Sequence, residues 1–240
     1  MQLLVSPKNR QEAIEAIKGG ADIIDVKNPL EGSLGANFPW VIKEIRQLTP
    51  PTIAISATIG DLDYKPGTAA QAALGAAFCG TNYVKLGLFG KMSKEQAIDL
   101  VDKVVSAANL FSPKIKVAVA GYADAHRIGA IDPMLVPIIT SNAKAHVAMI
   151  DTAIKDGKST FDFLKESQLR NFVNDSHRLG LMTALAGNLQ KNDLLKVWKL
   201  KVDIVGVRSA VCKNGRTGKI DRKLVQDLVK YIQQLRTKNI

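Results

Sequence analysis

The chain alternates between short apolar runs and longer amphipathic segments, and the runs recur about every 20 to 35 residues. The apolar runs predict buried β-strands, and the segments with apolar positions three and four residues apart predict helices. The predicted strands are 2–6, 22–27, 53–59, 82–88, 115–121, 146–152, 181–187 and 203–208. The predicted helices are 10–18, 40–48, 68–79, 94–110, 133–142, 167–179, 189–200 and 222–235.

Eight βα units in 240 residues predict an α/β fold, a closed (β/α)₈ TIM barrel. Several helices end in glycine just before the next strand, as at Gly19-Gly20, Gly80 and Gly180, which suits a left-handed helix end. A doubly wound open sheet is the alternative, but no GxGxxG follows the first strand. Because no linker divides the chain, we expect one domain over residues 1–240.

Composition narrows the class of protein. The chain is 46% hydrophobic and 23% charged, as in ordinary globular domains, and no apolar run reaches the roughly 18 residues that a membrane helix needs. The first residues lack a basic leader, so we expect a cytoplasmic protein without membrane contact. Cys79 and Cys212 lie far apart, and the three histidines are scattered, so we expect reduced thiols and no metal site.

The net charge of +11 favours an anionic partner. A solvated basic surface and a phosphate-binding pocket both account for the charge. Nucleic acid is disfavoured because aromatic residues make up only 5% of the chain and no recognition motif is present. A basic nucleic-acid-binding barrel, with affinity that falls steeply with salt, remains the alternative from another class.

Charged residues interrupt predicted strands that should be apolar on both faces. Because side chains alternate along a strand, Ile24 and Val26 face the helices, and Asp25 and Lys27 point into the barrel. The same alternation directs Lys85 of the fourth strand inward. Lys27 and Lys85 then lie near the carboxyl ends of their strands, where barrel active sites are built.

The sixth and eighth strands repeat this pattern with Asp151 and Arg208. Side chains from alternate strands share a barrel layer, so Lys27, Lys85, Asp151 and Arg208 are predicted to meet at the mouth. A structural ion-pair network is the other interpretation, but burying so many charges is costly and favours chemistry. Two facing lysines disfavour each other's ammonium form, so one is a candidate nucleophile towards a carbonyl.

Glycines near the ends of the last two strands predict a phosphate site. Gly187 and Asn188 follow the seventh strand, and Gly206, Arg208 and Ser209 close the eighth, where this fold often binds phosphate.

Three loops could complete the mouth. Loop 28–37 is polar and glycine-bearing, as a mobile lid would be, and loop 154–158 brings a further cation in Lys155. Loop 213–219 is interpreted as a solvated basic loop, with a lid as the alternative.

The sequence resembles the (5-formylfuran-3-yl)methyl phosphate synthase family of methanofuran biosynthesis over nearly the whole chain. The resemblance rests on Asp25-Val26-Lys27-Asn28-Pro29, Glu31 to Trp40, Lys65-Pro66-Gly67-Thr68, Ala120-Gly121-Tyr122-Ala123-Asp124, Asp151 to Gly157 and Val205-Gly206-Val207-Arg208.

The resemblance implies a lyase that condenses two glyceraldehyde 3-phosphate molecules, with loss of phosphate and water and with no cofactor. It implies a Schiff base on Lys27, proton acceptance by Lys85, and proton transfers assisted by Asp25, Asp151 and Lys155. We expect a homo-oligomer.

Two other enzyme classes are alternatives to the synthase. A phosphosugar decarboxylase would have a DxKxxD motif, which begins at Asp25 but lacks its closing carboxylate because Leu30 stands there. A reversible class I aldolase on phosphorylated sugars fits the lysines equally well.

Overall fold

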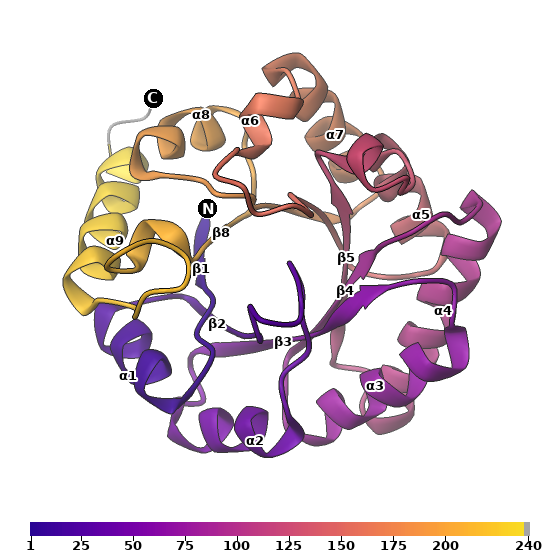
Figure 1. Cartoon of the computed structure of the whole chain (residues 1–240), viewed down its shortest axis with the longest axis horizontal. Helices are drawn as coiled ribbons and strands as arrows, with labels where there is room; N and C mark the ends of the chain where they lie inside the picture. The colour runs from indigo at the N-terminus through magenta and orange to yellow at the C-terminus, as the bar shows by residue number, and fades with distance from the viewer. Residues whose placement is uncertain (238–240) are drawn as a thin grey trace.

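The computed structural model describes residues 1–237, which form a closed barrel of parallel strands in the order β1 to β8, with β8 paired to β1. Figure 1 looks down the barrel, with the helices in a ring outside the strands. The predicted TIM barrel is confirmed. The strands are β1 (Gln2–Val5), β2 (Ile23–Val26), β3 (Ala54–Leu62), β4 (Tyr83–Leu88), β5 (Lys116–Tyr122), β6 (Val147–Asp151), β7 (Met182–Leu185) and β8 (Ile204–Val207).

Helices follow the strands around the ring. They are α1 (Arg10–Gly19), α2 (Pro39–Leu48), α3 (Pro66–Phe78), α4 (Lys94–Phe111), α5 (Val136–Asn142), α6 (Thr160–Phe163), α7 (Glu166–Arg178), α8 (Leu194–Lys199) and α9 (Arg222–Thr237). Short 3-10 turns are η1 (Ala125–Arg127), η2 (Pro133–Leu135), η3 (Lys191–Asp193) and η4 (Ser209–Val211). The sequence pattern missed α6 and the turns η1 and η4. Within residues 1–237, no helix combines the length and apolarity needed to cross a bilayer.

Two separate apolar clusters hold the barrel. The larger packs the outward strand faces, such as Ile24 and Val26, against the helices. The smaller fills the barrel interior, where β5 contributes Ala118 and Ala120, β7 contributes Ala184, and the residue after β7 is Ala186. These short side chains leave space inside the barrel that longer side chains from β2, β4 and β6 can occupy.

A repeated hydrogen bond ties the strands together at the amino end of the barrel. At the start of each even-numbered strand, a polar side chain accepts a hydrogen bond from a backbone N–H of the preceding strand. The acceptors and donors are Asp22 and Leu3, Asn82 and Ile55, His146 and Val117, and Asp203 and Thr183. This end of the barrel is thereby stabilised, as expected for the face opposite the active site.

Candidate active site

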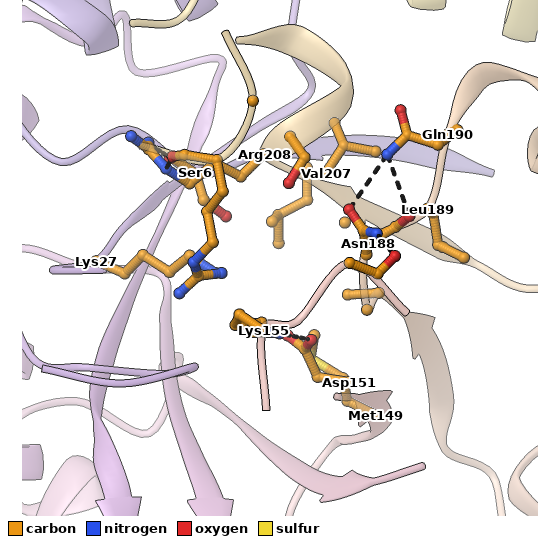
Figure 2. Close-up of a pocket in the computed structure, with 18 of the residues that line it drawn as sticks. Ser6, Lys27, Met149, Asp151, Lys155, Asn188, Leu189, Gln190, Val207 and Arg208 are labelled. Carbon is orange, nitrogen blue, oxygen red and sulfur yellow. Dashed lines mark hydrogen bonds and ion pairs between the residues drawn. The ribbon is translucent and has the colours of Figure 1, made fainter. Parts of the chain in front are cut away.

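A cavity of about 350 Å³ opens at the carboxyl ends of the strands (Figure 2). Nine of the ten candidate residues line it: Lys27, Lys85, Asp151, Lys155, Gly187, Asn188, Gly206, Arg208 and Ser209. The tenth, Asp25, is completely buried and contacts Lys85. The inward orientation predicted from strand alternation is therefore observed for all five charged residues: Asp25, Lys27, Lys85, Asp151 and Arg208.

Lys85 and Asp25 form a buried ion pair. The Lys85 Nζ lies 2.6 Å from Asp25 Oδ2, and both side chains are almost fully excluded from solvent. Ser6 donates a second hydrogen bond to the same oxygen at 2.9 Å. Burial alone would raise the pKa of Asp25, but Lys85 and Lys27 hold it below its usual value. Asp25 therefore remains ionised and fixes the Lys85 amine at the cavity wall.

Lys155 and Asp151 form a second pair at the mouth. Lys155 Nζ donates to Asp151 Oδ1 at 2.6 Å and to Thr152 Oγ1 at 3.1 Å. Burial would raise the pKa of Asp151, but Lys155 and Lys27 bring it down to about 2. Burial lowers the pKa of Lys155, and Asp151 opposes that shift. In Figure 2 this pair lies between Lys27 and Asn188.

Lys27 differs from the other two lysines of the cavity. Its Nζ donates to the backbone carbonyl of Ser33 at 3.2 Å and has no carboxylate within 4.0 Å among residues 1–237. Burial lowers the pKa of Lys27 to about 7; Asp151 opposes that shift, and Lys85 and Lys155 add to it. A substantial fraction of Lys27 is thus a neutral, nucleophilic amine at neutral pH.

Loop 28–37, which we expected to be a mobile lid, makes buried contacts through its inner residues. Leu34 is completely buried in the interior cluster, and its N–H donates to Asp61. Ser33 Oγ donates to the Thr152 carbonyl at 2.8 Å, and Thr58 Oγ1 donates to the Gly35 carbonyl at 2.6 Å. These contacts place residues 33–35 in the wall of the barrel mouth beside Lys27.

The seventh-strand edge presents backbone donors to the cavity. Gly187 has a φ of +93°, and a Cβ there would collide with Thr160, so only glycine fits. Asn188 has a φ of +50°, and its side chain donates to the Gly157 carbonyl at 2.5 Å. Within the described chain, the N–H groups of Gly187, Asn188 and Ser209 have no protein acceptor. Such groups can bind phosphate oxygens.

Arg208 lines the cavity, but its guanidinium N–H groups already donate hydrogen bonds to acceptors within the protein. Nη1 donates to the Ser6 carbonyl and to Glu12, and Nη2 donates to Glu12 and to the Gly218 carbonyl. Nε donates to the Arg216 carbonyl at 2.8 Å. All five N–H donors of the guanidinium therefore have acceptors. Sequence alternation predicted where Arg208 points, but could not predict these partners.

Two residues of the mouth were missed by the sequence analysis. Asp61 accepts hydrogen bonds from the buried Tyr122 hydroxyl and from the Leu34 N–H, and so joins β3, β5 and loop 28–37. Most of loop 213–219 is exposed, as expected, but Arg216 is half-buried and lines the cavity. Asp61 lies near the end of a strand, as the other site residues do, and that position was the available signal.

Titratable groups elsewhere do not suggest a metal centre. No cluster of three or more His, Cys, Asp or Glu side chains within residues 1–237 is arranged to hold a metal ion. Cys79 and Cys212 are buried free thiols.

The fold and the lysine-lined mouth define a TIM-barrel enzyme. The family model described as 4-HFC-P synthase matches residues 3–229. A relative from Methanocaldococcus jannaschii is 53% identical over 230 residues, covering 95% of this chain and 98% of its own. One from Methanococcus aeolicus is 51% identical over 235 residues, covering 97% and 100%. Both are named (5-formylfuran-3-yl)methyl phosphate synthase. The chain belongs to the 4-HFC-P synthase family.

Solved structures with low sequence identity share the fold. Phosphoribosyl anthranilate isomerase from Thermus thermophilus superposes with a TM-score of 0.66 at 15% identity, covering 98% of this chain and 100% of its own. KGPDC from Streptococcus mutans gives 0.67 at 17% identity, covering 98% of each chain. These similarities confirm the barrel and carry no information on substrate.

Proposed function

We propose that this enzyme condenses two glyceraldehyde 3-phosphate molecules to (5-formylfuran-3-yl)methyl phosphate for methanofuran biosynthesis, with Lys27 forming a Schiff base. The balanced reaction releases one phosphate and two waters. The family and the names of its members support the product. The observation that carries the mechanism is that Lys27, unlike Lys85 and Lys155, has no ion-pair partner within the described chain. Its amine is therefore available to attack a carbonyl.

The two ion pairs suit the proton transfers that follow. Imine formation at the substrate carbonyl releases water and acidifies the adjacent carbon, so a base must remove a proton there. Lys85 Nζ lies 2.6 Å from the Asp25 carboxylate, and Lys155 Nζ lies 2.6 Å from the Asp151 carboxylate at the mouth, so each pair joins a proton donor to an acceptor. We propose that Lys85 accepts the carbon-bound proton after passing its own to a departing oxygen, while the Asp25 carboxylate holds the amine in place.

The phosphate groups of the substrates need hydrogen-bond donors in the cavity. We propose that the free N–H groups of Gly187, Asn188 and Ser209 bind one phosphate, with Gly206 allowing close approach. A reversible aldolase would use the same lysine and the same phosphate site. Release of inorganic phosphate together with growth of furan absorbance separates the synthase from the aldolase.

Borohydride reduction in the presence of glyceraldehyde 3-phosphate tests the mechanism. Reduction converts the imine to a stable amine, and peptide mass mapping locates it. We expect the adduct on Lys27. Labelling confined to exposed lysines such as Lys43 or Lys65 would contradict the Schiff base on this residue.

The pH dependence of trapping follows from the pKa of Lys27. Burial places that pKa at about 7, and only the neutral amine attacks. We expect the initial trapping rate to rise about tenfold per pH unit below 7 and to level off above it. Single-turnover trapping between pH 5 and 9 measures the profile. A rate that still rises about tenfold per pH unit between pH 8 and 9, as for an exposed lysine, would contradict the neutral amine.

A further inference from the structure

The carboxyl mouth contains two arginines that differ in what they contact. Arg208 is buried, and its five N–H donors all have protein acceptors. Arg216 lines the same cavity from loop 213–219, and one of its nitrogens, Nη2, donates to the Gly32 carbonyl at 3.0 Å. Within residues 1–237 the other donors of Arg216 have no acceptor. Of the two guanidinium groups, only that of Arg216 is available to a ligand.

Arg208 contacts the backbone of the loop that carries Arg216. Its Nε holds the Arg216 carbonyl at 2.8 Å, and its Nη2 holds the Gly218 carbonyl at 3.3 Å. The other side of the same guanidinium is fixed by Glu12 of α1, which is 3% exposed. The loop also has a backbone hydrogen bond from Lys213 to Lys219 that closes its base. Arg208, which is paired with the buried Glu12, therefore hydrogen-bonds two backbone carbonyls of loop 213–219.

The acceptor that Arg216 contacts is itself fixed in place. Gly32 has a φ of +136°, and a Cβ there would collide with Asp61, so this position requires glycine. Asp61 in turn is held by Tyr122 and by the Leu34 N–H. The contact joins loop 213–219 to loop 28–37 above Lys27. A phosphate dianion would be a far stronger acceptor for a guanidinium than this neutral carbonyl.

We infer that Arg216 supplies the guanidinium that binds a phosphate group of the substrate, exchanging the Gly32 carbonyl for phosphate oxygens, and that Arg208 is a positioning residue that presents Arg216. This inference rests on the proposed function, because it assigns a ligand to the phosphorylated substrate of the same site. It changes the role expected of Arg208 from direct phosphate contact to support of the loop. Arg216 is positioned to bridge phosphate between its own loop and the wall beside Lys27.

Glycerol 3-phosphate is the probe for this inference, because it has the phosphate but no carbonyl and cannot form a Schiff base. Isothermal titration should show an affinity about 10- to 100-fold weaker for Arg216→Ala than for the unaltered enzyme. Arg216→Lys should give an intermediate loss, since it keeps the charge without the fork. Lys219→Ala removes the same charge from an exposed position of the same loop and should leave binding unchanged. Equal losses in Arg216→Ala and Lys219→Ala, or no loss in either, would overturn the inference.

A double-variant cycle separates contact from positioning. If Arg208 acts through Arg216, Arg208→Lys alone should weaken glycerol 3-phosphate binding. Combined with Arg216→Ala, it should cause little further loss of affinity. Independent, additive losses would show that Arg208 contacts the phosphate itself. Thermal melting checks that each variant folds. If Arg208→Lys does not fold, the binding measurements on Arg216→Lys and Lys219→Ala test the inference without it.

Failure of this inference is distinguishable from failure of the proposed function. Borohydride trapping on Lys27 with unaltered glycerol 3-phosphate binding in Arg216→Ala would retain the Schiff base and reject Arg216. Loss of binding in Arg216→Ala without any Lys27 adduct would reject the Schiff base and retain the phosphate ligand. In steady-state assays, Arg216→Ala should raise KM for glyceraldehyde 3-phosphate more than it lowers kcat.

Discussion

Lys27→Met is expected to reduce furan formation by on the order of 10⁴-fold or more, because loss of a covalent nucleophile removes the reaction path itself. The same substitution should abolish borohydride trapping. It should not destabilise the fold, since the Lys27 amine is buried without an ion-pair partner in the described chain and methionine retains most of the side-chain volume. Initial rates, trapping and thermal melting of the purified variant measure the three effects.

Lys155→Met is the matched comparison for Lys27→Met, because Lys155 is another cavity lysine of the same length and is paired with Asp151. It should lose activity through impaired proton transfer but still form the reduced adduct on Lys27. If the adduct in the unaltered enzyme maps to Lys155, or if Lys27→Met retains more than a tenth of the activity, then Lys27 is not the nucleophile.

Much of the site could be predicted from strand periodicity. Asp25, Lys27 and Lys85 interrupt apolar strands, and a period of two leaves only the barrel interior for them. Because parallel strands end on one face of the barrel, residues from β2, β4 and β6 must converge there. The structure shows this convergence, with Lys27, Lys85 and Asp151 around one cavity.

The partners of those residues could not be predicted, because they depend on distances between elements far apart in the chain. Strand periodicity predicted that Lys27 and Lys85 both point into the barrel and did not distinguish them. In the described chain Asp25 forms an ion pair with Lys85, and Lys27 has no ion-pair partner. Likewise, nothing local to Arg208 reveals that Glu12, 196 residues earlier, occupies its guanidinium. Loop 28–37 looked mobile from its polar composition, but burial of Leu34 anchors it.

The Lys85–Asp25 pair is expected to show strong coupling in a double-variant cycle of stability. Asp25→Asn leaves an ammonium, and Lys85→Met leaves a carboxylate, buried without its counter-charge. Each single substitution should lower the free energy of unfolding by about 3–5 kcal/mol. The double variant removes both charges, so it should recover most of that loss. Urea denaturation of the four proteins measures the coupling, and additive losses would mean that the pair is not an interacting unit.

Activity in the same four proteins distinguishes a structural ion pair from a proton-transfer pair. If Lys85 accepts a substrate proton, the double variant should remain about 10²- to 10⁴-fold less active than the unaltered enzyme even though its stability has returned. A purely structural pair would restore activity together with stability. Borohydride trapping on Lys27 should persist in the double variant, because imine formation precedes the proton transfer assigned to Lys85. Recovered folding with a trapped imine and no furan would therefore place Lys85 and Asp25 in the step after Schiff-base formation.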